Sequence, residues 1–141
     1  MPRAKAVAAQ ALVPITVVFG ANAAILDTFV FTAIGDYELL AVSEVHDVAG
    51  TDAGAVTLNV RKCASGTSVA SGTSLLATTF NLKSTADTPV IKRVSNDGLA
   101  AVPTRIVTAG QAIALDFTGT LTALTGVAVT LWLKPLTRPT Y

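Results

Sequence analysis

The chain has 141 residues, of which only 13% are charged, about half the share found in an average soluble domain. Its 10 Lys and Arg residues nearly balance 9 Asp and Glu residues, and a net charge of +1 is too small for electrostatic capture of a nucleic acid. Cys63 is the single cysteine, which excludes an intrachain disulfide. Ala, Thr, Ser, Gly and Val must therefore form much of the surface, and we expect one face to pack against another protein.

Strand signals dominate the chain. The one helix-friendly segment, residues 4–12, is ended by Pro14. Beyond it, runs rich in β-branched residues are separated by turn formers such as Gly35-Asp36 and Asn96-Asp97-Gly98. The predicted strands are residues 13–19, 25–33, 37–46, 55–63, 74–82, 90–94, 104–108, 111–117 and 126–133. Short strands at this spacing predict an all-β fold, either a sandwich or a barrel.

Several runs alternate between large apolar and small or polar residues, as antiparallel strands with one buried face do. In the last run Val129 and Leu131 share the apolar face, and Thr130 and Trp132 lie opposite. Trp132 then belongs either to an interface or to a second core layer. We expect an oligomer interface that contains Thr130, Trp132 and Tyr141. The expected core includes Phe29, Phe31, Val56, Leu58, Val60, Leu115, Phe117, Val129 and Leu131.

The two ends differ from the middle and divide the chain into an N-terminal arm (1–24), a β-sandwich domain (25–133) and a C-terminal tail (134–141). The arm is rich in alanine and holds an apolar set with no evident place in a compact sandwich. We therefore expect this arm to bind a partner, with two basic residues for acidic groups and the apolar set for pockets. These predicted partner-binding residues are Arg3, Lys5, Val7, Leu12, Val13, Ile15, Val17 and Phe19.

The same N-terminal segment imitates a secretory leader. Basic residues precede an apolar stretch from 6 to 19, and a small-x-small sequence follows at 21–23. Pro14 and the β-branched residues after it favour a strand instead. The stretch is also too short to span a bilayer, which takes about 20 apolar residues.

Residues that could carry chemistry are few. His46 is the only histidine and falls at a predicted strand end, which indicates a residue at the rim of the sheet. Asp47 and Asp52 share a Gly-containing loop that offers oxygen ligands for calcium but matches no calcium-loop pattern. Glu44 and Asp116 read as rim or turn carboxylates. Because phosphate-binding motifs are also absent, we expect no enzyme activity, no metal and no cofactor.

Three segments, residues 43–63, 72–88 and 111–135, resemble tailed-bacteriophage capsid decoration (cement) proteins. The resemblance covers about residues 25–135 and rests on whole segments, without a diagnostic motif. It implies a β-sandwich or jelly roll with extended arms, a homotrimer, and binding to the major capsid protein. It also implies a location on the capsid exterior after synthesis in the host bacterial cytoplasm, with no nucleic acid or membrane partner. Proteins of this kind have no catalytic residues to carry over.

Two other functions fit the same sequence. The first is a different virion position, in the tail, the neck or a fibre. The second is a secreted carbohydrate-binding module, which would explain a sandwich but needs exposed aromatic side chains and a cleaved leader. The resemblance favours a capsid protein that bridges capsomers, and the low charge of the chain agrees with packing against other protein subunits.

Overall fold

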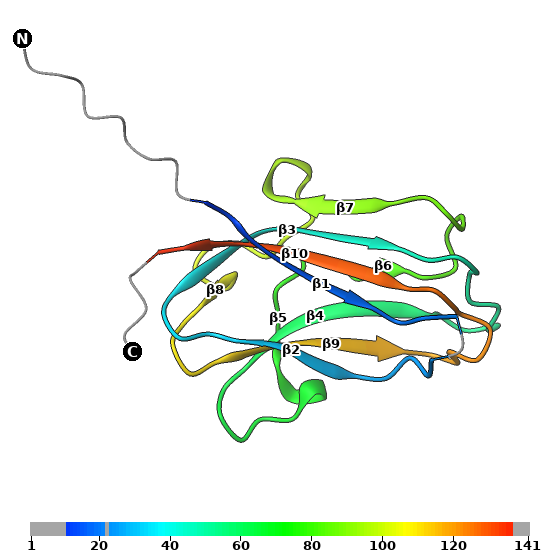
Figure 1. Cartoon of the computed structure of the whole chain (residues 1–141), viewed down its shortest axis with the longest axis horizontal. Helices are drawn as coiled ribbons and strands as arrows, with labels where there is room; N and C mark the ends of the chain where they lie inside the picture. Colours follow the sequence, from blue (N-terminus) through cyan, green and yellow to red (C-terminus); the bar gives the residue numbers. More distant parts are fainter. Residues whose placement is uncertain (1–10, 22, 137–141) are drawn as a thin grey trace, which may run out of the picture.

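Short runs of strand-forming residues fold into two antiparallel sheets that pack face to face (Figure 1). The computed structural model describes residues 11–21 and 23–136. Strands and two single-turn 3₁₀ helices make up its regular structure. In chain order these are β1 (Val13–Val18), β2 (Thr28–Thr32), β3 (Tyr37–Val45), β4 (Thr57–Cys63), η1 (Val69–Ser71), β5 (Thr73–Ser74), β6 (Phe80–Asn81), β7 (Val90–Arg93), η2 (Val94–Asn96), β8 (Ile106–Val107), β9 (Ala112–Thr118) and β10 (Ala128–Pro135).

The strand order is that of a jelly roll. Sheet A has the order β1-β10-β3-β7, with β8 also paired to β3, and sheet B has the order β2-β9-β4-β5, with β6 also paired to β4. If β5 and β6 are taken as one interrupted strand and the short β8 is set aside, the chain folds back on itself. The first strand then pairs with the last, and the second with the one before it. The expected all-β sandwich is confirmed.

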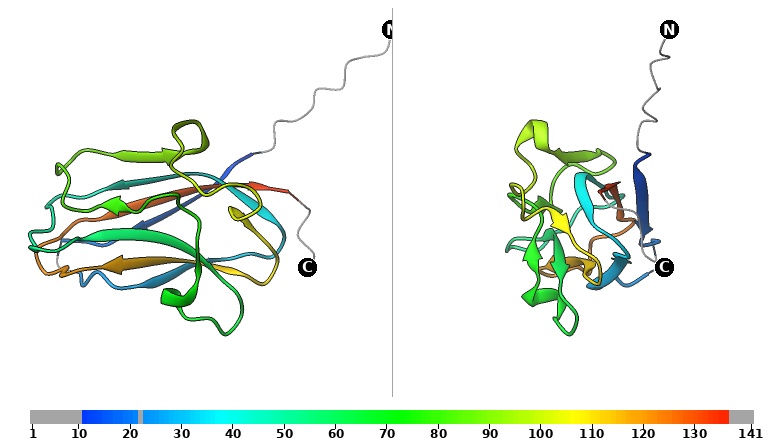
Figure 2. Two further views of the ribbon diagram at one scale, coloured as in Figure 1. Left: turned by 180° about the vertical axis from the view of Figure 1, so that it is seen from behind. Right: turned by 90° about the vertical axis from the view of Figure 1, so that its left-hand side faces the viewer.

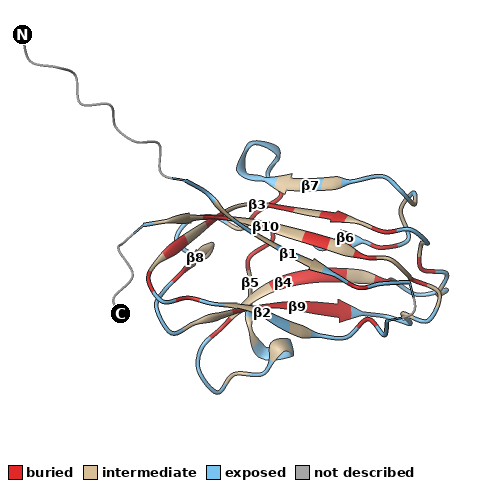
Figure 3. Cartoon of the chain, in the orientation of Figure 1, coloured by how far each residue is buried: buried red, intermediate tan, exposed pale blue. Residues whose placement is uncertain are grey.

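The core lies between the sheets and holds most of the predicted residues. Leu58, Val60, Leu115 and Leu131 are fully buried, as expected from the alternation. Figure 3 shows the same alternation as buried and partly exposed segments along β10.

Phe29 is the wrong member of the predicted core, because its side chain is 54% exposed. The pairing of β2 with β9 shifts register between Phe29 and Phe31, and such a bulge turns the later residue to the other side of the strand. Phe31 packs against the core instead, with its ring edge-on to Tyr37 at 5.1 Å between centroids.

The run 74–82, predicted as one strand, is two short pieces, β5 and β6. Leu75 and Leu76 are both buried, which an alternating strand does not allow for neighbours. The Ser74 hydroxyl accepts a hydrogen bond from the amide of Leu76 at 3.2 Å and bends the chain there.

The predicted boundary between arm and domain at residue 24 is also displaced. Residues 13–18 form β1, which pairs along its whole length with β10. At the other end, β10 continues to Pro135, so the sandwich reaches beyond residue 133. In Figure 1 these two strands, from opposite ends of the sequence, lie side by side.

Candidate interaction surface

The outer face of sheet A is a low-charge surface built by four strands. Side chains at every second position of β1, β10, β3 and β7 point away from the core and line up across the sheet. Trp132 lies between Pro14 and Ala41, and Thr130 lies between Thr16 and Ser43. The hydroxyls of Thr16 and Thr130 are 3.0 Å apart. We call this surface the outer A face, and its central residues are Pro14, Thr16, Val18, Ala41, Ser43, Val45, Ile91, Ala128, Thr130 and Trp132.

Charged side chains lie at the margins of the outer A face. Arg93 is at the β7 end of the row that contains Trp132. At the far end of β10, Lys134 lies opposite Glu38, which forms an ion pair with Arg105 at 3.0 Å. A surface with an uncharged middle and a charged margin has the composition of a protein interface, where charged residues are depleted from the centre.

The structure brings two of the predicted interface residues together. Thr130 and Trp132 both lie on the outer A face and are half-buried in the single chain. The alternation of β10 was the signal that predicted this, and its burial pattern confirms the alternation. Tyr141 lies outside the described residues.

The predicted arm residues divide into three groups. Arg3, Lys5 and Val7 lie outside the described residues. Leu12 lies just before β1 and is 45% exposed. The prediction is wrong for the last group, whose side chains face inward from β1 and its end and pack with the core. They have a place in the sandwich because β1 completes sheet A. These residues are Val13, Ile15, Val17 and Phe19.

Glu44 and His46, predicted at the rim of a sheet, form a buried pair of ionisable groups. Glu44 and His46 are 1% and 0% exposed. Glu44 in β3 and His46 directly after β3 continue the two-residue spacing that begins at Val42, so the alternation already pointed them inward. His46 Nδ1 lies 2.7 Å from Glu44 Oε1, and His46 Nε2 lies 3.1 Å from the carbonyl oxygen of Ser84.

These contacts fix how protons are shared. The Ser84 carbonyl can only accept, so His46 Nε2 carries a hydrogen and donates it. The contact between Nδ1 and Oε1 then needs one further proton, on either the ring or the carboxyl. Burial raises the pKa of the Glu44 carboxyl, and the hydrogen bond and charge of His46 offset this only in part. Both ring nitrogens are occupied, which leaves His46 no free nitrogen for a nucleophile or a metal.

The carboxylate oxygens of Asp52 accept hydrogen bonds from backbone amides of nearby loops and are not directed towards a metal ion. Its Oδ2 accepts the amide of Thr120 at 2.9 Å, and its Oδ1 accepts the amide of Gly54 at 3.3 Å. These bonds, with that of Thr120 the largest, lower the pKa of the carboxyl. Within residues 11–21 and 23–136, no three His, Cys, Asp or Glu side chains gather as a metal site.

Sheet B carries a polar arrangement on its outer side. Asp116, predicted at a rim, is a buried residue of β9 and forms an ion pair with Arg61 of β4. Arg61 also donates to the carbonyl of Gly72 at 2.9 Å, which ties the 64–72 loop to the sheet. Asn59 beside them accepts from the Ser74 hydroxyl at 2.8 Å. These groups satisfy one another.

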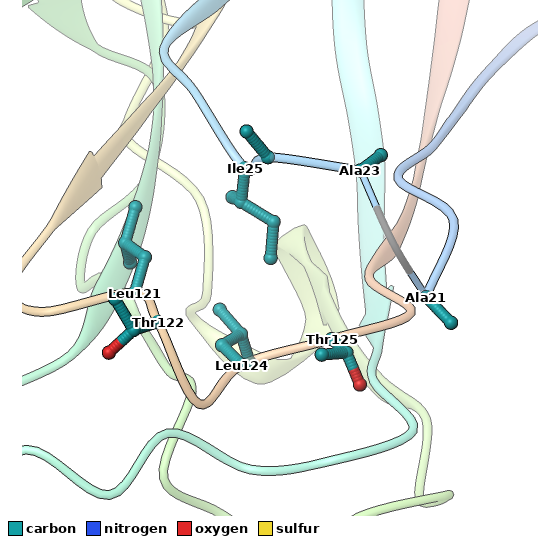
Figure 4. A pocket seen from close by; sticks show the side chains of 8 residues that line it. Ala21, Ala23, Ile25, Leu121, Thr122, Leu124 and Thr125 are labelled. Carbon is teal, nitrogen blue, oxygen red and sulfur yellow. The ribbon is translucent and has the colours of Figure 1, made fainter.

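Two shallow hollows lie at the margins of the sandwich. One, of about 400 Å³, lies between the β1–β2 and β9–β10 connections (Figure 4). Ile25, Leu121 and Leu124 line it together with small residues, so it offers few polar groups to orient a ligand. The other, of about 420 Å³, contains Lys62, whose ammonium donates to the Ile106 carbonyl at 2.8 Å.

No helix in the described part of the chain is long and apolar enough to cross a membrane. Comparison of the sequence with known protein families found no family that matches, and comparison with curated proteins found no relative. The outer A face is therefore the candidate functional surface on physical grounds.

Proposed function

We propose that this protein is a structural virion component that binds the outside of a phage capsid as a homo-oligomer and stabilises it by bridging capsomers. The main support for this proposal is the outer A face. Its middle is uncharged and contains Trp132, whose ring is the kind of anchor that dominates binding at interface centres. The partner would be the major capsid protein, and the resemblance implies a trimer. On this proposal the protein is made in the host cytoplasm and acts without a catalytic site.

The jelly-roll order supports the proposal at a coarse level. Viral capsid proteins use this fold, but so do lectins, and a fold alone does not assign a function. The pairing of β1 with β10 holds both ends of the sandwich domain in one sheet, which suits a structural component. The same properties serve a protein of the tail, neck or fibre, so copy number must decide between these positions.

The first experiment mixes the purified protein with purified phage heads and measures co-sedimentation. We expect saturation at hundreds of copies per head, whereas a handful of copies would place the protein in the tail or neck. Trp132→Ala should weaken binding by at least about tenfold, as expected for a central aromatic anchor. Thr118→Ala, an exposed position at the end of β9 in sheet B, is the matched control and should bind as the parent does.

The predicted basic residues of the N-terminal segment receive a separate test. Arg3→Ala combined with Lys5→Ala should weaken head binding less than Trp132→Ala, and more visibly at low salt, because exposed ion pairs contribute under about 1 kcal/mol. Equal binding by the double variant at all salt concentrations would remove these two residues from the interface.

One observation favours the second candidate, a carbohydrate-binding module. The Phe29 ring is exposed on β2, and sugar-binding sites use exposed aromatic rings as stacking surfaces. A glycan array with the parent protein and Phe29→Ala tests it. Glycan binding that is lost in the variant would favour this function over capsid binding.

A further inference from the structure

The two edges of sheet A differ in how their backbone groups are used. At the β7 edge, the side chain of Asn96 occupies the outward groups. Its Oδ1 accepts the amide of Arg93 at 2.8 Å, and its Nδ2 donates to the carbonyl of Ile91 at 2.8 Å. The amide of Gly98 donates to the Arg93 carbonyl at 3.0 Å. The turn that follows β7 thus covers this edge, as natural sheets commonly do against unwanted strand pairing.

The β1 edge has no such cover among the described residues. The amide of Phe19 donates to the Val127 carbonyl at 2.8 Å, which sets the phase of the ladder with β10. Amides and carbonyls at odd positions therefore face β10, and those of Thr16 and Val18 face away from the sheet. Pro14 lies in the same outward phase, where its missing N–H removes no bond to β10. The right-hand view of Figure 2 shows β1 (dark blue) at the rim of the sandwich.

The geometry points to β1 as a pairing edge for the β1 strand of a second copy of this chain. The two strands would run antiparallel with Thr16 opposite Thr16 of the second copy. In that register the two Thr16 residues exchange both of their outward hydrogen bonds. Each Val18 amide then donates to the Pro14 carbonyl of the other copy. Pro14 has no amide to offer, and this register uses only its carbonyl.

The side chains around this edge favour a second copy as the occupant. A two-fold axis at Thr16 brings identical surfaces together, and charged groups there would repel their own copies. Pro14, Thr16 and Val18 carry no charge, and neither do Ala128 and Thr130 beside them on β10. Val18 is 66% exposed and is a large apolar side chain available for burial at the contact.

One strand pair is smaller than a standard interface of about 800 Å² per partner, so the contact is weak in dilute solution. Neighbouring copies fixed on a common surface would have a high effective concentration, and the same contact would then form readily. In a trimeric coat it would join one trimer to the next. The inference rests on the proposed self-association. Pro14, Thr16 and Val18 also belong to the outer A face, so head binding is judged with Trp132→Ala, which leaves the backbone of the β1 edge unchanged, and edge pairing is judged with the Thr16 variants in the absence of heads.

The test exploits the two-fold register. Thr16→Lys and Thr16→Glu each place like charges directly opposite one another across the axis, which destabilises strand pairing. We expect each variant alone to associate at least about tenfold more weakly than the parent in sedimentation equilibrium at up to about 500 μM. An equimolar mixture should recover association to within about threefold of the parent, because Lys then faces Glu. Thr118→Lys on sheet B is the control and should associate as the parent does.

Amide exchange gives a second readout that needs no variant. The Thr16 and Val18 amides should gain protection as the parent concentration rises, while the Ile15 and Val17 amides, which face β10, stay protected throughout. A parent that remains monomeric with fast exchange at Thr16, variants that associate normally, or a mixture that fails to recover would each overturn the inference. Circular dichroism of both variants confirms that they are folded before the comparison is made.

Discussion

The Nδ1 atom of His46 lies 2.7 Å from Oε1 of Glu44 between the two sheets, where neither side chain is exposed to solvent. One proton shared between them leaves the pair neutral as a unit. Removal of that proton leaves a buried carboxylate, and a second proton leaves a buried cation. Both changes are costly in a low-dielectric interior. The cluster therefore links the stability of the sandwich to pH.

Glu44→Gln should flatten part of that pH dependence. The Gln amide can donate to Nδ1 while Nε2 still donates to the Ser84 carbonyl, so no shared proton is needed. The raised pKa of Glu44 means that its contribution to the free energy of unfolding is fully present below the unfolded pKa and is lost as pH rises through the folded one. In urea unfolding, the free energy of unfolding of the variant should rise relative to that of the parent from pH 4 to pH 8. Parallel profiles would contradict this.

His46→Leu should be strongly destabilising at pH 7. It leaves the Glu44 carboxyl without a partner in the core, and an unpaired buried charge costs about 3–5 kcal/mol. The loss should shrink towards pH 4, where the carboxyl is protonated. The double variant Glu44→Leu with His46→Leu is the control and should recover much of the stability, because an apolar pair of similar volume has no charge to desolvate. A double variant as unstable as His46→Leu would place the cost in packing instead.

Asp52→Asn should lower the melting temperature slightly at pH 7 and not at all near pH 2. The hydrogen bonds from Thr120 and Gly54 stabilise the ionised carboxyl and lower its pKa. A lowered pKa contributes stability that is present above the unfolded pKa and is lost as pH falls through the folded one. Thermal unfolding at the two pH values measures the difference. A deficit that persists at pH 2 would show that the loop depends on hydrogen-bond geometry and not on charge.

Two glycines with positive φ allow the cost of an unfavourable backbone conformation to be measured apart from the cost of a steric clash. Gly110 has φ +87°, and the position that a Cβ would occupy there is open, so Gly110→Ala should cost about 1–2 kcal/mol from conformation alone. Gly119 has φ +100°, and a Cβ there would collide with the backbone carbonyl of Ala55. Gly119→Ala should therefore cost clearly more in denaturant unfolding. Equal losses would mean that the Ala55 segment moves aside freely.

Two truncations distinguish the contribution of residues 1–10 to stability from that of β1. Deletion of residues 1–10 removes none of the contacts described for the sandwich, and the melting temperature should stay within about 2 °C of the parent. Deletion of residues 1–19 removes β1, uncovers the core residues against which Ile15 and Val17 pack, and should give an aggregating or unfolded protein. Size-exclusion chromatography and circular dichroism distinguish the two. A well-folded protein without residues 1–19 would show that β1 is dispensable.

The alternation of residues was enough to predict most strands, because a sheet with one buried face repeats every two residues and that period is local. It placed Thr130 and Trp132 on the outside and Leu131 in the core. It failed at Phe29, because a bulge depends on how β2 fits β9, and the partner strand is remote in sequence. It failed at residues 74–82 because Ser74 bonds to Leu76 and diverts the chain.

The candidate surface was harder to predict than the fold. The apolar set of β1 looked surplus because nothing near it in sequence could bury it, and only the pairing with β10 gives it a place. The pair Glu44 and His46 is the opposite error, because these polar residues were expected at a rim and are buried. Glu44 in β3 and His46 directly after it face inward, but their polarity favours a rim, and the carbonyl that accepts from His46 comes from Ser84 on another segment.

The pairing of β1 with β10 has a consequence for how the chain matures. Val13 lies opposite Leu133, so β1 is synthesised well before the strand that pairs with it. The long stretch of chain between β1 and β10 must close into a loop before that contact forms, which favours slow folding. Until then Ile15, Val17 and Phe19 have no sheet to cover them. The nascent chain would thus be exposed to aggregation and to chaperones until β10 has emerged and sheet A can form in full.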